Sequence, residues 1–88
     1  MIENRTIYTI LDEHGEQSTI TLRKLVADVL QESQPDVHTW IQCKYNKVAQ
    51  KKPWLNRRQK GNLVRALSEK EAEKLPRYKE MFNELFGF

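Results

Sequence analysis

The sequence has a single cysteine, Cys43, and therefore cannot close a disulfide within the chain or build a zinc site from cysteines. It also has no apolar run near the roughly 18 residues that a transmembrane helix needs. The first residues, Met-Ile-Glu-Asn-Arg, lack the basic and apolar regions of a secretory signal. For a chain of 88 residues we expect one domain, located in the reducing cytoplasm and not associated with a membrane.

Acidic residues are missing from a long internal window, between Asp36 and Glu69. The same window holds eight cations, which are Lys44, Lys47, Lys51, Lys52, Arg57, Arg58, Lys60 and Arg65. Its local charge is +8 while the whole chain carries +3, so the remaining residues sum to −5. Segregated charge of this kind attracts polyanions or acidic partners, whatever the overall charge of the chain.

Motifs of catalysis and cofactor binding are also missing: there is no HExxH, CxxC, P-loop or GxGxxG. His14 and His38 lie 24 residues apart, and neither belongs to a constellation with serine or cysteine. Cys43 follows His38 by five residues, a helical spacing that points the two side chains to different faces. We expect Cys43 to be a buried or half-buried helix residue. We expect no enzyme, no catalytic residue, no metal and no cofactor.

Residues 1–21 are predicted to form a β-hairpin. Arg5–Leu11 and Ser18–Leu22 are rich in Ile, Thr and Tyr, and they flank a six-residue polar loop that contains Gly15. A first helix over Ile2–Leu11 is the competing prediction. Residues 12–16 carry three acids and a histidine, which have the chemistry of metal ligands. Such sequences are more typical of a solvated turn, and this is the interpretation we favour.

The remaining chain is predicted to be helical, with a core over 22–67 and C-terminal helices over 68–88, which makes the fold class mainly α. Apolar residues at helical spacing predict three helices, over Leu22–Gln31 with Thr21 as N-cap, over Asp36–Gln50 and over Asn56–Leu67. The small Ala27 would allow a second helix to approach the first. The second helix is expected to bury a stripe made of Val37, Trp40, Ile41, Tyr45 and Val48.

The C-terminal residues predict two short helices. Ser68-Glu69-Lys70-Glu71 has the pattern of a capping box, which predicts a helix from Ser68 to about Leu75. Pro76 would begin a last helix, and Gly87 would end it. Its apolar stripe is Tyr78, Met81, Phe82, Leu85 and Phe86. We expect this stripe to close the core of the monomer. The alternative is a homodimer surface made of Tyr78, Met81, Phe82, Phe86 and Phe88.

The first two helices of the predicted core have the pattern of a helix-turn-helix. The matching segments are Val26–Leu30 and Gln34–Ile41. Gln34, Val37 and Trp40 have the spacing Q-x-x-V-x-x-W, and Ala27 lies ten residues before Val37. This arrangement resembles the helix-turn-helix of the lambda repressor and Cro class of DNA-binding proteins.

The resemblance implies that the second helix enters the major groove of DNA, with Val37 and Trp40 as packing residues. It implies an exposed base-reading face, made of Gln34, Asp36, His38, Thr39 and Gln42. The basic window would supply the phosphate contacts, from Lys44, Lys47, Lys51, Lys52, Arg57, Arg58 and Lys60. We therefore expect a small sequence-specific DNA-binding protein that regulates transcription.

Two other partners fit the same charge pattern. A small adaptor or inhibitor would bind an acidic protein through the basic window. An RNA-binding protein would use the same cations, and it would stack unpaired bases on Tyr45 and Trp54. Dependence of DNA affinity on base sequence would separate a DNA reader from an adaptor, whereas sensitivity to salt would not.

Overall fold

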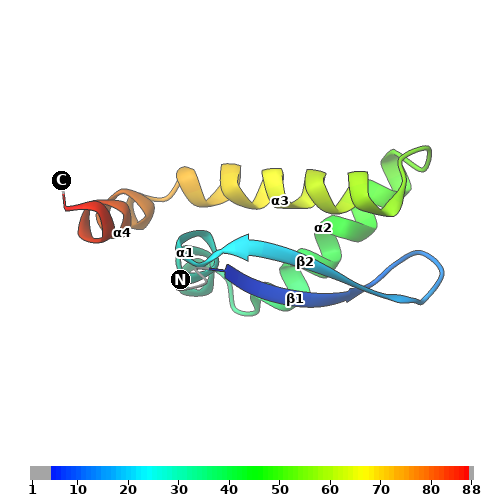
Figure 1. Cartoon of the computed structure of the whole chain (residues 1–88), viewed down its shortest axis with the longest axis horizontal. Helices are drawn as coiled ribbons and strands as arrows, with labels where there is room; N and C mark the ends of the chain where they lie inside the picture. The colour runs from blue at the N-terminus through cyan, green and yellow to red at the C-terminus, as the bar shows by residue number, and fades with distance from the viewer. Residues whose placement is uncertain (1–4, 88) are drawn as a thin grey trace.

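The N-terminal part of the chain is a β-hairpin, as the sequence predicts (Figure 1). The computed structural model describes residues 5–87. Strand β1 (Arg5–Leu11) pairs antiparallel with β2 (Gln17–Arg23), and Ile7 lies opposite Thr21. The turn requires Gly15, whose φ of 77° lies in the left-handed region. A helix over Ile2–Leu11 is wrong from Arg5 onward, and residues 2–4 lie outside the described part of the chain.

Helix α1 (Lys24–Ser33) follows β2 without a loop. The predicted start at Leu22, with Thr21 as N-cap, is wrong because both residues belong to β2, where Leu22 is fully buried. Arg23 occupies the N-cap position and makes no side-chain capping bond. The apolar residues at helical spacing do enter the core, which takes from this helix Leu25, Val26, Ala27, Val29 and Leu30.

Helix α2 (Val37–Lys51) begins and ends within one residue of the prediction. Its buried residues are Val37, Ile41, Tyr45 and Val48, and Trp40 is partly buried against the same core. Three residues separate α1 from α2, fewer than the four that separate the predicted helices over 22–31 and 36–50. Helix α2 packs more extensively on α3 and β1 than on α1, and the structure does not confirm a helix-turn-helix unit.

Helix α3 (Arg57–Glu73) is longer than the sequence predicts. It begins with a capping box in which the Asn56 side chain accepts from the Gln59 backbone and the Gln59 side chain accepts from the Asn56 backbone. The box predicted at Ser68 is wrong, because Ser68 is fully buried and its hydroxyl donates to the Val64 carbonyl within the same helix. In Figure 1, α3 runs along the hairpin, and α2 crosses behind both.

Helix α4 (Pro76–Phe86) ends at Gly87, which has the left-handed conformation expected of a C-cap. No residue of this helix is fully buried. Tyr78, Met81 and Phe82 pack against the core, as expected for the stripe, whereas Leu85 and Phe86 are exposed. Phe88 lies outside the described residues. Within residues 5–87, no helix combines the length and the apolar character needed to cross a bilayer.

Candidate nucleic-acid interface

The predicted base-reading face of α2 lies against strand β1. The Gln42 side chain accepts a hydrogen bond from the Leu11 backbone N–H and donates one to the Leu11 carbonyl, both at 2.8 Å. One turn earlier, a ring nitrogen of His38 hydrogen-bonds to the Thr9 carbonyl. These two side chains satisfy backbone groups on the outer edge of β1, beside which residues 5–87 place no further strand. Two of the five base-reading candidates are therefore hydrogen-bonded to strand β1.

The other three base-reading candidates lie at or before the N-terminus of α2. Asp36 is the N-cap, and its carboxylate accepts from the Thr39 hydroxyl at 2.7 Å and from the Thr39 backbone N–H at 3.3 Å. These bonds hold the pKa of Asp36 below its ordinary value, with the hydroxyl as the largest cause. Gln34 ends α1, where its backbone N–H donates to the Leu30 carbonyl. Its side chain is half-buried.

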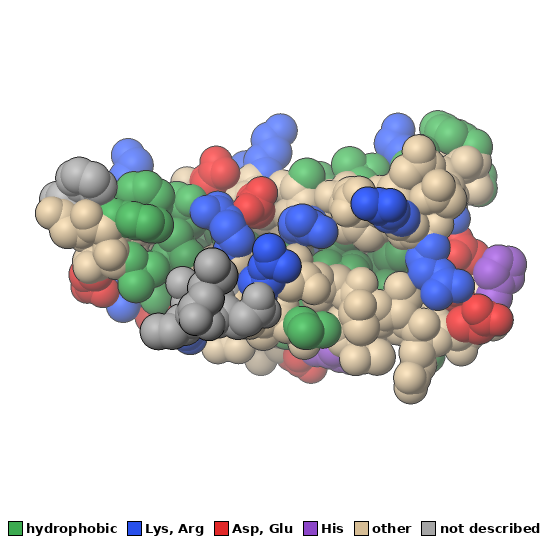
Figure 2. Space-filling view, viewed as in Figure 1, with side chains coloured by type: hydrophobic (Ala, Val, Ile, Leu, Met, Phe, Trp, Pro, Cys, Tyr) green, Lys and Arg blue, Asp and Glu red, His purple; other side chains and the backbone are tan. Residues whose placement is uncertain are grey.

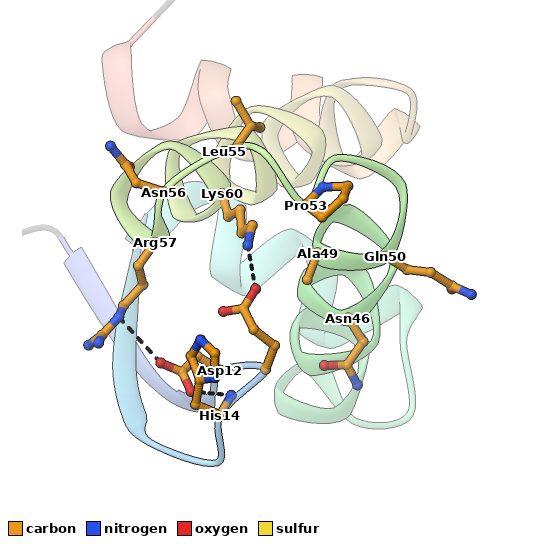
Figure 3. A pocket seen from close by; sticks show the side chains of 11 residues that line it. Asp12, His14, Asn46, Ala49, Gln50, Pro53, Leu55, Asn56, Arg57 and Lys60 are labelled. Carbon is orange, nitrogen blue, oxygen red and sulfur yellow. Dashed lines mark hydrogen bonds and ion pairs between the residues drawn. The ribbon is translucent and has the colours of Figure 1, made fainter.

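The hairpin turn approaches the start of α3 and pairs with two of the eight cations (Figure 3). Arg57 lies 3.4 Å from an oxygen of Asp12 and 3.3 Å from one of Glu16. Lys60, only 5% exposed, pairs with Glu13. A cavity of about 690 Å³ between the turn, the end of α2 and the start of α3 is lined by four of these groups, Asp12, Glu13, Arg57 and Lys60. The prediction of a solvated turn is wrong for Asp12, because this residue is buried. Lys60 is also buried, so its ammonium group does not belong to the exposed basic surface.

Two carboxyl groups of this turn, Asp12 and Glu13, have lowered pKa values. Backbone N–H groups of Glu16 and His14 donate to Asp12, and the first of these is the main reason that the Asp12 pKa falls. The pKa of Glu13 falls chiefly because of the hydrogen bond from Lys60. Within residues 5–87, no three His, Cys, Asp or Glu side chains gather in a way that could hold a metal ion.

Tyr45 connects this turn to the core. Its hydroxyl donates to the second oxygen of Glu13 at 3.2 Å, and its ring is fully buried. Burial, followed by the charge of Glu13, raises the pKa of Tyr45 to about 12. The RNA-binding hypothesis required this ring to stack on an unpaired base. Because the ring is buried, it is not available for that contact. Trp54 is available, since it is 71% exposed in the turn between α2 and α3, with the Lys52 ammonium 5.4 Å from its ring.

Five cations of the window are exposed and make no ion pair within residues 5–87: Lys47, Lys51, Lys52, Arg58 and Arg65. Lys44 is half-buried with its ammonium 5.2 Å from the Trp40 ring. Arg58 and Arg65 belong to α3 and line a groove between α3 and β2. The three lysines lie at the end of α2, and they line a groove between α2 and α3. Figure 2 shows the side of α3 that faces β2, with Lys and Arg side chains spaced along α3 above the hairpin.

Some features of this region have no clear signal in the sequence. The pairing of the turn with Arg57 and Lys60 joins residues more than 40 positions apart, and only the opposite charges of the two segments suggest it. The attachment of Gln42 to β1 has no signal of its own, because glutamine is also a common surface residue. Cys43 is exposed, so the prediction of a buried or half-buried cysteine is wrong. It follows Gln42 on the side of α2 that faces away from the core.

The fold and surface together define a mainly helical domain with an N-terminal hairpin and a partly neutralised basic surface. Comparison with protein-family models, with curated proteins and with solved structures gives no match for this chain. The function therefore has to be argued from the surface itself.

Proposed function

We propose that this protein binds double-stranded DNA through contacts to phosphates, in the cytoplasm and without catalytic activity, as a small regulator of transcription. The observation that supports the proposal is the group of five exposed cations around α2 and α3 that have no carboxylate partner within residues 5–87: Lys47, Lys51, Lys52, Arg58 and Arg65. Exposed cations without internal partners release counterions from DNA when they reach its phosphates.

Base reading by α2, as in a helix-turn-helix, is the finer part of this proposal. His38 and Gln42 are bound to β1, so reading would fall to Gln34, Asp36 and Thr39 at the start of the helix. A reader of two half-sites needs a dimer. The exposed Leu85 and Phe86, which extend the apolar stripe of α4, are the surface we propose for it.

A titration of a short, fluorescein-labelled duplex of random sequence tests the proposal. We expect dissociation constants on the order of 1–100 μM at physiological salt, the usual range for sequence-independent binding. With five exposed cations, the slope of log K against log salt is expected to be no steeper than about −4.5. Unlabelled single-stranded RNA serves as a competitor, because the exposed Trp54 could stack on unpaired bases. Absence of binding at low salt would remove DNA as a partner.

An acidic protein partner is the second candidate, and the hairpin turn favours it. Arg57 binds the carboxylates of Asp12 and Glu16, and Lys60 binds that of Glu13, so cations of this window already pair with carboxylate groups inside the chain. An adaptor or inhibitor would extend the same pairing to acidic side chains of another protein. Titration with duplexes of different base sequence distinguishes the two candidates, because a basic adaptor would bind any DNA weakly at low salt without preference for a sequence.

A further inference from the structure

The cations on the two sides of α3 lie in different surroundings. On one side, a groove of about 430 Å³ separates α3 from strand β2. Its polar lining residues are Ser18, Thr19, Thr21, Arg57, Arg58, Asn62 and Arg65. No carboxylate of residues 5–87 lines it. The nearest acid further along α3 is Glu69, which is already paired with Arg23 at 2.8 Å. The groove therefore has a positive charge that no acid in its lining cancels.

The guanidinium groups of this groove are spaced along α3. Arg58 and Arg65 are seven residues apart, so they project from the same side of the helix about 10 Å from each other. Both are exposed, and neither has an ion-pair partner within residues 5–87. Arg57 is held at one end of the groove by Asp12 and Glu16. Arg65 donates only a long hydrogen bond, of 3.5 Å, to the Asn62 side chain. Two guanidinium groups without a carboxylate partner at this separation can contact different phosphates of one strand, which advances about 3.4 Å per nucleotide along the helix axis.

Strand β2 contributes neutral hydrogen-bond donors to the same groove. The hydroxyls of Ser18, Thr19 and Thr21 make no side-chain hydrogen bond within residues 5–87. In the described part of the chain the sheet has two strands, so the edge of β2 away from β1 lacks a strand partner there. Alternate backbone N–H groups on that edge have no ladder bond. Hydroxyl and backbone N–H groups are common donors to phosphate oxygens in protein–DNA complexes.

The groove on the other side of α3 has a different chemistry. It has a volume of about 360 Å³ and is lined by four lysines, Lys44, Lys47, Lys51 and Lys52, around the apolar side chains of Val48, Leu63 and Leu67. Two of the four lysines lie over tryptophan rings. A lysine ammonium acts as a point charge, whereas the planar guanidinium binds phosphate through two parallel hydrogen bonds. The apolar side chains of Val48, Leu63 and Leu67 in this groove have no group that could hydrogen-bond to a phosphate.

We propose that the groove between β2 and α3 is the phosphodiester-binding site of this protein. Arg58 and Arg65 donate to the phosphate oxygens of one DNA strand, and the hydroxyls of β2 donate to the same backbone. The lysine groove between α2 and α3 lies outside this contact. The inference rests on the proposed function and deepens it, because it assigns the phosphate contacts to one side of α3.

Two charge-matched double variants test the assignment. Arg58→Gln with Arg65→Gln and Lys47→Gln with Lys51→Gln each remove two exposed positive charges from the same part of the chain. We expect the arginine pair to weaken binding of the labelled duplex by about tenfold or more for each arginine. We expect it to reduce the salt slope by about 2. The lysine pair is expected to weaken binding and to reduce the salt slope less than the arginine pair does, because these lysines line the other groove.

A third variant, Arg58→Lys with Arg65→Lys, keeps the charge and removes the planar donor pair. It is expected to retain the salt slope of the wild type but to bind more weakly. Circular dichroism spectra of all variants verify that the fold is kept. Equal losses from the arginine and lysine pairs, or a larger loss from the lysine pair, would overturn the assignment to this groove while leaving DNA binding intact. Failure of the wild-type protein to bind any duplex would instead overturn the proposed function, and the site with it.

Discussion

The role of the Gln42 side chain can be tested directly. The sequence predicts that it contacts a DNA base, whereas in the structure it is hydrogen-bonded to strand β1. Gln42→Ala removes two hydrogen bonds to the Leu11 backbone, both 2.8 Å long. A hydrogen bond contributes a net 0.5–1.5 kcal/mol, and Leu11 is half exposed, so water replaces part of each bond. We therefore expect a loss of about 1–2 kcal/mol in the free energy of unfolding.

Thermal and urea unfolding measure this loss. A decrease of 1–2 kcal/mol corresponds to a fall in Tm of about 5–10 °C for a domain of this size. Hydrogen exchange gives a local measure, since the Leu11 amide is expected to exchange faster once its acceptor is gone. Gln42→Glu keeps an acceptor for the Leu11 N–H, but its carboxylate cannot donate to the Leu11 carbonyl. We expect this variant to lose at least as much stability as Gln42→Ala.

Gln50→Ala is the matched control, on the same helix. Gln50 is exposed and makes no side-chain hydrogen bond within residues 5–87. Both substitutions gain the same few tenths of a kcal/mol in helix propensity, so the difference between them isolates the bonds to β1. If both variants had equal stability and Gln42→Ala reduced only the discrimination between DNA sequences, the structural role of Gln42 would be refuted.

Two further predictions concern titration. Asp12 and Glu13 have lowered pKa values in the fold, so their stabilisation is present above about pH 4 and is lost as the pH falls through the lowered values. The double variant Asp12→Asn with Glu13→Gln is expected to lose less stability than the wild type between pH 7 and pH 3, as measured by urea midpoints; equal losses would contradict the assignment. Tyr45 has its pKa raised to about 12, so its stabilisation is lost as the pH rises from about 10 through 12. An absorbance titration is expected to show a phenol with a midpoint of about 12 that is missing in Tyr45→Phe, and retention of this midpoint in the variant would show that another tyrosine is responsible.

Local sequence signals predicted most of the elements. Alternating Ile, Thr and Tyr around a glycine-containing loop identified the hairpin, and apolar spacing identified α2 to within one residue. The errors occurred where tertiary packing overrode a local motif. Ser68 has the residues of a capping box around it, but its buried hydroxyl bonds within α3, so the helix continues. Leu22 fits a helical stripe and a strand equally well, and pairing with Thr6 places it in β2.

The candidate site was less predictable, because charge in a sequence does not show which charges will be neutralised in the fold. Eight cations in an acid-free window suggested one basic surface. Folding brings the hairpin turn against the start of α3. The acidic residues of the turn then pair with Arg57 and with the buried Lys60. Side-chain contacts between segments 30 to 50 residues apart, such as Gln42 with Leu11, depend on the packing of whole elements. A single sequence contains no local signal for them.

Helix α4 has a consequence for how the molecule loses its structure. None of its residues is fully buried, and part of its attachment is ionic, through Arg77 to Glu32 at 3.0 Å. An element with so little burial opens with less free energy than the domain as a whole. We therefore expect proteases to cut first around Leu75, releasing α4 while the hairpin and the first three helices stay folded. Salt screens the ion pair between Arg77 and Glu32, so the free energy needed to detach α4 is expected to fall as ionic strength rises. The hairpin and the first three helices would then unfold as one cooperative unit, separately from α4.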